Sequence, residues 1–167
     1  DIAGSRTHAA MLAHQGVISQ EDADKIDAGL KRIKGEIEAG NFPFDINNED
    51  IHMSIESVLT SEIGDAGARL HTGRSRNDQV CTDTRLFAKK RARDLMAANV
   101  ELREALVSQA EEHFDVILPG YTHMQHAQPV LFSHHMLAYV WMLDRDFDRL
   151  RAAYDAADAN PLGSAAL

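Results

Sequence analysis

The sequence predicts an all-α fold, in which a small N-terminal helical unit is followed by long antiparallel helices of a truncated helical bundle. Apolar residues recur every three or four positions along most of the chain, which is the period of a helix with one buried face. No segment alternates apolar and polar residues convincingly at a period of two, so strands are not expected. We divide the chain into an N-terminal helical domain, residues 1–77, and the first part of a long-helix domain, residues 78–167. We expect the first domain to be incomplete at its start and the second at its end.

The first helices are marked by composition and by punctuation residues. Residues 2–15 are rich in alanine and predict a helix. Ser19 followed by Asp22 is similar to a capping box, in which a hydroxyl and a carboxylate serve the first free N–H groups of a helix. One apolar stripe follows at steps of three and four, formed by Ala23, Ile26, Leu30, Ile33 and Ile37. Gly40 and Pro43 are expected to end that helix.

A third helix is predicted from about residue 48. Glu49 and Asp50 would lie at the positive end of its dipole, where carboxylates are stabilising. Its apolar face is expected to consist of Ile51, Ile55, Val58 and Leu59. Gly64 would close it.

Two longer helices are predicted in the second domain. Residues 78–114 contain neither proline nor glycine, and one face is expected to carry Ala88, Ala92, Leu95, Leu102, Leu106 and Ala110. Pro119 and Gly120 interrupt the pattern, and a further helix after Pro129 carries a stripe of Met136, Val140, Leu143, Phe147, Leu150 and Tyr154. This repeat of about 3.5 residues is typical of long helices that pack at shallow angles. Two antiparallel helices cannot bury such faces alone, so we expect a larger bundle or other subunits to complete the core.

Composition excludes several classes of function. Acidic residues outnumber basic ones by 26 to 17 and the formal charge is −9, which disfavours nucleic-acid binding. No apolar run approaches the roughly 18 residues of a spanning helix, so no membrane partner is expected. The single cysteine, Cys81, cannot form an internal disulfide and is expected to be a small buried packing residue in a cytoplasmic protein. Both ends of the chain look cut, which indicates a fragment of a longer protein.

The first group of residues suited to chemistry is residues 71–79, His-Thr-Gly-Arg-Ser-Arg-Asn-Asp-Gln. These side chains precede a helix N-terminus, where free N–H groups and the dipole favour an anion such as a substrate carboxylate. The alternative is a polar helix start with Asn77 or Asp78 as the N-cap and solvated arginines.

The second group is residues 120–129, Gly-Tyr-Thr-His-Met-Gln-His-Ala-Gln-Pro. A turn here would place the His123 imidazole near the Thr122 hydroxyl, and histidine is the usual general acid or base. The alternative is a histidine that caps a helix, or an adventitious metal pair with His126. No cysteine ligands and no His-Glu-x-x-His motif accompany these residues, so no native metal site is expected.

Segments 73–79 and 119–129 resemble the argininosuccinate lyase family of the fumarase/aspartase superfamily. Residues 49–52 (Glu-Asp-Ile-His), 70–73 (Leu-His-Thr-Gly) and 161–164 (Pro-Leu-Gly-Ser) are similar to that family as well, so the resemblance covers essentially the whole chain. The Arg-Ser-Arg-Asn-Asp-Gln form of the first motif favours argininosuccinate lyase over fumarase or aspartase.

The resemblance implies reversible elimination of fumarate from argininosuccinate to give arginine, the last step of arginine biosynthesis, without a cofactor. It implies catalytic roles for His123 and Thr122, and the direction of proton transfer at His123 stays open. The substrate-binding set that it implies consists of Asn77, Ser75, Arg76, Thr122 and Asp50.

The family's mobile loop, which carries a catalytic serine, is absent from these 167 residues. Each active site in the family is assembled from three subunits of a homotetramer, so the resemblance implies an active complete protein and an inactive fragment. Two alternatives stay open. One is a non-catalytic helical structural or assembly module related to the lyase, as in lens crystallins, and the other is adenylosuccinate lyase, which Arg74 and Arg76 on either side of Ser75 disfavour.

Overall fold

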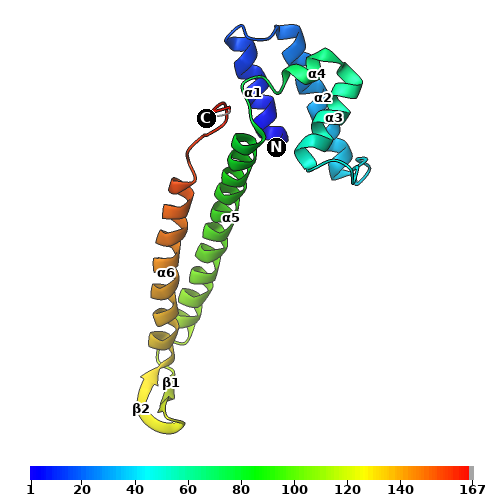
Figure 1. Ribbon diagram of the computed structural model, residues 1–167. Coiled ribbons are helices and arrows are strands. Elements are labelled where there is room, and N and C mark those ends of the chain that lie inside the picture. The colour runs from blue at the N-terminus through cyan, green and yellow to red at the C-terminus, as the bar shows by residue number, and fades with distance from the viewer. Residues whose placement is uncertain (166–167) are drawn as a thin grey trace. The chain divides into compact units, whose positions relative to one another are not determined.

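The computed structural model describes residues 1–165 and is predominantly helical, which confirms the predicted fold class (Figure 1). The chain divides into two compact units. The first comprises Asp1–Asp83 together with the residues from Asn160 onward, and the second comprises Thr84–Ala159. The domain boundary expected after residue 77 stays a prediction. Within the described residues, no helix has both the length and the apolar character needed to cross a membrane.

The first unit is built on four helices that share one apolar core. They are α1 (Ile2–His14), α2 (Gln20–Glu38), α3 (Ile51–Ile63) and α4 (Asp65–Arg69). The core consists of Ala9, Leu12, Ile18, Ala23, Ile26, Leu30, Ile33, Phe42, Ile55, Leu59 and Leu70. The stripe predicted on α2 is confirmed, because its first four members are buried and Ile37 packs against them. Each such large side chain contributes about 1.5–3 kcal/mol by leaving water.

The ends of these helices follow from capping. The Ser19 side chain accepts a hydrogen bond from the Asp22 N–H at 3.0 Å, which confirms the predicted cap of α2. Helix α3 begins at Ile51 rather than near residue 48, because the Asp50 carboxylate caps it by accepting from the Met53 N–H at 2.7 Å. Ile51 is exposed rather than on the buried face. Gly64 ends α3 with a φ of 63°, as predicted.

The second unit contains most of α5 (Arg76–Glu112), a hairpin of β1 (Ile117–Thr122) and β2 (Gln125–Leu131), and α6 (Phe132–Ala156). Helices α5 and α6 run antiparallel side by side, as predicted (Figure 1). Asn99 on α5 donates to the Leu143 carbonyl at 3.0 Å, and Arg103 pairs with Asp144 at 2.7 Å.

All residues of the stripe predicted on α6 are half-buried, which confirms that the stripe forms the less exposed side of this helix. The face predicted on α5 is only partly right. Ala92 and Ala110 are buried, but Ala88, Leu95 and Leu102 are exposed. The buried seam of α5 instead includes the polar Asn99, because its spacing from Ala92 keeps it in line with α6.

The prediction of a small buried cysteine was wrong. Cys81 is exposed, and so is its neighbour Val80. The buried side of this part of α5 carries the polar residues Asp78, Gln79 and Thr82. The first unit therefore covers a polar face of the helix, and the thiol points to solvent.

The β-hairpin was not predicted. Strand β1 pairs with β2 in antiparallel register, with Pro119 opposite Pro129 and an irregularity between Pro119 and Tyr121. Proline lacks an N–H and is tolerated at the edge of a sheet, and both strands of a two-stranded sheet are edges. As a result α6 begins at Phe132, whose N–H bonds to the Val116 carbonyl at 2.9 Å, and not directly after Pro129.

Candidate active site

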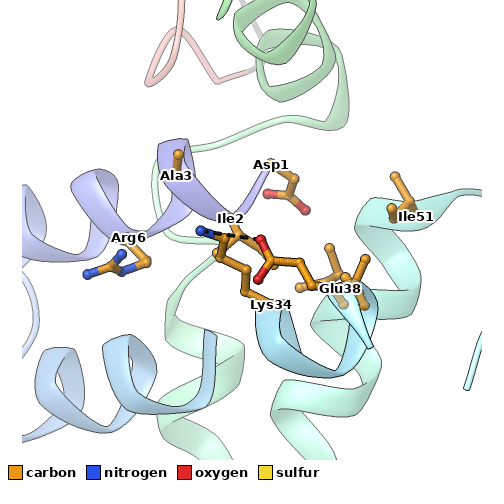
Figure 2. A pocket seen from close by; sticks show the side chains of 9 residues that line it. Asp1, Ile2, Ala3, Arg6, Lys34, Glu38 and Ile51 are labelled. Atoms are coloured by element: carbon orange, nitrogen blue, oxygen red, sulfur yellow. Dashed lines mark ion pairs between the residues drawn. The ribbon is translucent and has the colours of Figure 1, made fainter. Parts of the chain in front are cut away.

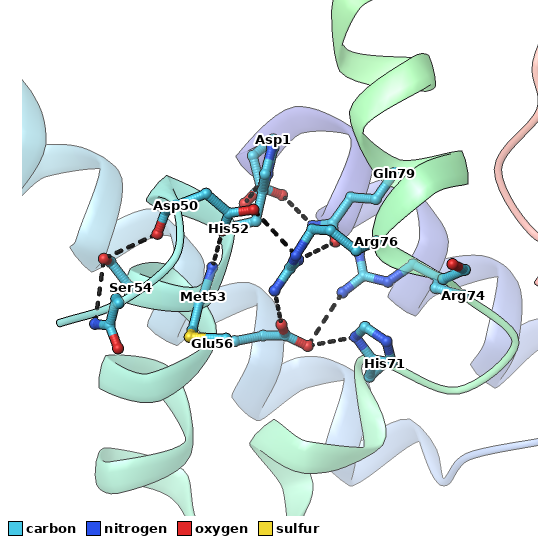
Figure 3. Close-up of polar contacts among 12 residues, drawn as sticks. Asp1, Asp50, His52, Met53, Ser54, Glu56, His71, Arg74, Arg76 and Gln79 are labelled. Atoms are coloured by element: carbon cyan, nitrogen blue, oxygen red, sulfur yellow. Dashed lines mark hydrogen bonds and ion pairs between the residues drawn. The ribbon is translucent and has the colours of Figure 1, made fainter.

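A polar cluster in the first unit surrounds Glu56 on α3 (Figure 3). One carboxylate oxygen of Glu56 lies 2.6 Å from Nδ1 of His71, and the other accepts from Nη2 of Arg76 at 2.9 Å. Nε of Arg76 lies 3.2 Å from the Asp50 carboxylate, and its Nη1 donates to Gln79. The Arg76 guanidinium is therefore held by three side chains, and Asp50 and Arg76 are brought together.

Arg74 is the most buried cation of the cluster, with 1% of its side chain exposed. Its Nη1 donates to the Ser5 hydroxyl at 2.8 Å, and its Nη2 lies 4.0 Å from Glu56. Nε and Nη2 have no hydrogen-bond partner among residues 1–165. Burial lowers the pKa of Arg74, because a desolvated guanidinium is less stable as a cation, and the nearby Glu56 carboxylate opposes that effect.

The N-terminus of α5 forms a second capping box. The Asp78 carboxylate accepts from the Ser75 N–H at 3.0 Å, and the Ser75 hydroxyl accepts from the Asn77 N–H at 3.3 Å. The cap is thus Ser75, and neither Asn77 nor Asp78. The Asn77 side chain is exposed and has no recorded partner in the described part of the chain, so its amide is free to bind a ligand.

The two other predicted residues lie at the tip of the hairpin. Thr122 ends β1, and His123 and Met124 form a two-residue turn with φ values of 50° and 60°. Two positive φ values in a two-residue loop are typical of the type I′ turn, which favours Asn and Gly. Here His123 and Met124 adopt it, and both side chains are exposed. Backbone strain of this kind is concentrated at functional sites.

A tyrosine–histidine pair flanks that turn. The Tyr121 hydroxyl lies 3.1 Å from Nε2 of His126, across the register of β1 and β2. The rings of the two side chains are 4.9 Å apart. His126 is therefore engaged within the hairpin, whereas the His123 imidazole has no recorded partner among residues 1–165.

The predicted residues fall into two groups, one in each unit. Asp50, Ser75, Arg76 and Asn77 belong to the first unit, and Thr122 and His123 to the second. Their roles in binding and catalysis stay predictions.

Sequence reasoning missed Glu56 and the role of Asp78. Glu56 is 15 residues from His71 and 20 from Arg76, so no local pattern connects them. Asp78 was detectable, because Ser75 and Asp78 have the same spacing as the recognised pair Ser19 and Asp22.

A shallow pocket of about 290 Å³ lies elsewhere in the first unit (Figure 2). Its lining consists of Asp1, Ile2, Ala3, Arg6, Lys34, Ile37, Glu38, Ile51 and Ile55. The charges at its rim are paired, with Lys34 lying 3.6 Å from Glu38 and Arg6 bound to Asp27. None of the predicted site residues lines it.

Three further side chains converge in the first unit. His52 Nδ1 lies 3.3 Å from the Asp1 carboxylate and 3.4 Å from that of Asp83, and the three ligand atoms fall within 4.8 Å of one another. Burial lowers the pKa of His52, which favours the neutral imidazole there. The expectation of no native metal site stays a prediction.

Comparison with known proteins extends over the whole chain. A family model described as "Lyase" matches residues 1–167. Curated proteins named argininosuccinate lyase are 53% identical in Desulfatibacillum aliphaticivorans and 51% identical in Carboxydothermus hydrogenoformans, in each case over 100% of this chain. The chain spans 36% and 37% of the length of these relatives, a little over a third.

Solved structures of related enzymes share the fold. EDDS lyase in complex with formate matches with a TM-score of 0.83 and 30% identity, over 97% of this chain and 31% of that one. A fumarate lyase from Mesorhizobium matches with a TM-score of 0.70 and 25% identity, over 90% of this chain and 36% of that one.

Proposed function

This chain belongs to the lyase family, and on that premise we propose that it forms part of an argininosuccinate lyase. The observation that carries the proposal is about 50% identity, along all 167 residues, to relatives that bear this name. The reaction would remove fumarate from argininosuccinate and release arginine, as in the last step of arginine biosynthesis. Because the chain spans about a third of those relatives, the activity is proposed for the longer protein and not for this chain alone.

The proposed reaction needs two proton transfers. A base removes a proton from the carbon next to a carboxylate, and the electron pair left behind becomes the carbon–carbon double bond of fumarate as the bond to the guanidinium nitrogen breaks. An acid then protonates the departing nitrogen of arginine. We assign one of these transfers to His123, whose exposed imidazole at a tight turn is accessible to a substrate. Thr122 is the adjacent hydroxyl.

The substrate carboxylates need hydrogen-bond donors that strengthen as negative charge develops. Asn77 is the best placed of the proposed residues, because its amide is exposed at the positive end of α5. Ser75 lies beside it. Arg76 and Asp50 form an ion pair with each other. We therefore infer that they support the neighbouring residues of the site and contact the substrate only if this ion pair breaks.

We also propose self-association into a homotetramer. Many large apolar side chains are exposed on both long helices. They are more numerous than the scattered single apolar residues that are normal on the surface of a monomer. They include Leu86, Phe87, Leu95, Leu102, Leu137, Tyr139, Trp141 and Met142. Second copies of α5 and α6 would bury this surface as in a larger bundle. A cytoplasmic location stays part of the proposal.

The test is steady-state kinetics of the full-length protein with argininosuccinate, following fumarate by its ultraviolet absorbance. Adenylosuccinate serves as the competing substrate and residues 1–167 alone as the inactive control. Cleavage of argininosuccinate by the full-length protein supports the proposal. Preference for adenylosuccinate, or absence of cleavage with either substrate, would refute it and favour a related lyase or a structural module.

A further inference from the structure

Asp78 connects two backbone segments that lie far apart in the sequence. Its Oδ1 accepts from the Ser75 N–H at 3.0 Å. Its Oδ2 accepts from the N–H groups of Gly163 and Ala165, at 3.1 Å and 2.9 Å. These two residues are 85 and 87 positions away, and Asp78 is only 6% exposed. One buried carboxylate therefore joins the start of α5 to the segment at 160–165.

The segment at 160–165 is a turn that directs its N–H groups to one point. The Leu162 N–H is bound by the Asn160 side chain at 3.1 Å, and Gly163 adopts a φ of +98°. A Cβ atom added to Gly163 would lie 4.0 Å from the Gly73 carbonyl oxygen, so the turn packs beside the loop that precedes α5. The loop and the turn form one wall, and Asp78 lies between them.

Only an ionised carboxylate satisfies all three donors. Burial raises the pKa of Asp78, but the N–H groups of Ser75, Ala165 and Gly163 outweigh burial, so the pKa lies below its usual value. Asparagine has one accepting oxygen where aspartate has two. In place of the second oxygen, the NH₂ group of asparagine would face a backbone N–H, which is also a donor. The isosteric change Asp78→Asn therefore releases either Ser75 or the turn.

We propose that Asp78 is a positioning residue of the candidate site. Its carboxylate holds Ser75 and Asn77 at a fixed position relative to the turn at 160–165. It acts through a short chain of contacts, because the Ser75 N–H is bound by Asp78 and the Ser75 hydroxyl binds the Asn77 N–H. The inference rests on the proposed function, in which Asn77 binds a substrate carboxylate.

The kinetic test compares Asp78→Asn, Asn77→Ala and the double variant in the full-length protein. A displacement of about 1 Å at a binding group costs up to about a hundredfold, so we expect Asp78→Asn to lower kcat/KM roughly ten- to a hundredfold, with a rise in KM. Because Asp78 acts through Asn77, the double variant should lose much less than the product of the two single effects. Effects that simply multiply would overturn the proposal.

Asp22→Asn is the matched control, because Asp22 occupies the same position in the capping box of α2, and its carboxylate pairs with Arg69, which is not a residue of the candidate site. Both variants should lower Tm through loss of a cap, but Asp22→Asn should keep the wild-type KM and kcat. An equal change of KM in both variants would reduce the role of Asp78 to stability. If Asp78→Asn does not fold, Asp78→Glu keeps the charge and displaces the carboxylate by one methylene, and a wild-type KM in that variant would overturn the proposal.

Amide hydrogen exchange separates this inference from the proposed function, because it needs no activity. In Asp78→Asn, exchange in peptides that contain residues 160–165 should be faster than in the wild type and in Asp22→Asn. Unchanged exchange refutes the positioning role even if the enzyme is active. A wild-type protein without lyase activity refutes the proposed function, whatever the exchange result.

Discussion

Replacing His123 by asparagine at the tip of the hairpin separates catalysis from folding. His123 occupies the first position of a two-residue turn with a φ of 50°, and Met124 the second with a φ of 60°. Asparagine tolerates this left-handed region better than histidine and is favoured in type I′ turns. The change thus removes the imidazole while it improves the backbone preference.

The expected magnitudes follow from exposure and chemistry. The His123 side chain is exposed and buries no core surface, so the free energy of unfolding should change by less than about 1 kcal/mol, towards greater stability if at all. Loss of a positioned acid or base should lower kcat by roughly 10²–10⁴-fold. The pattern expected is therefore an unchanged Tm with a large loss of kcat.

Steady-state kinetics and thermal melting of the full-length protein measure both quantities. The control is His126→Asn on the same hairpin, because His126 is engaged by the Tyr121 hydroxyl at 3.1 Å and has no assigned proton transfer. We expect kcat of His126→Asn to fall by less than about tenfold, because the change removes a contact within the hairpin but no proton-transfer group. A His123→Asn variant with near-wild-type kcat would make His123 a structural turn residue and refute the mechanism.

Three further outcomes are expected. Asn77→Ala should raise KM and lower kcat with an unchanged Tm, since the residue is exposed and we propose that it binds substrate in the ground and transition states; a KM equal to wild type contradicts this. Gly29→Ala should lower Tm, because the new Cβ would lie 2.5 Å from Cδ1 of the fully buried Leu59 and overpacking costs about 1–3 kcal/mol. The control Gly35→Ala meets open space in the same helix and should raise stability by about 0.5–1 kcal/mol, so equal melting temperatures would disprove the packing argument. Trp141→Glu, at a side chain 65% exposed on α6, should weaken self-association in sedimentation velocity, and an unchanged tetramer would exclude this surface from the interface.

Helices α1, α2 and α3 of the first unit were predictable because local signals agree with packing, whereas the short helix α4 was not predicted. The α2 stripe from Ala23 to Ile33 matches the buried core, and Ser19 caps the helix where its spacing to Asp22 indicated. Such signals need only the period of the helix and the bonding needs of its ends. Gly64 ended α3 for the same kind of reason, since it adopts a positive φ.

Helix α5 shows where a local pattern is insufficient. It carries apolar residues on several sides, and only its partner helix decides which side is buried. Leu95 is exposed and Asn99 is buried, because Asn99 is in line with α6 and bonds to the Leu143 carbonyl. Near Cys81 the first unit covers α5 instead, and it buries the side that carries Asp78, Gln79 and Thr82.

The hairpin and the polar clusters depended on contacts between distant residues. Pro119 and Pro129 discourage a strand, yet they pair across a two-stranded sheet whose outer edges need no N–H from them. Glu56 reaches Arg76 only because the fold brings α3 to the start of α5.

The sequence by itself determined the helical class, the caps and the chemical types at residues 71–79 and 120–129, because these depend on short-range periodicity and on residue identity. Only the tertiary structure decided the buried face of α5, the strained turn at His123 and the connection of Asp78 to Gly163. Burial and hydrogen bonding between segments 85 residues apart arise when the chain folds back on itself, and no local pattern encodes which donors will meet which carboxylate.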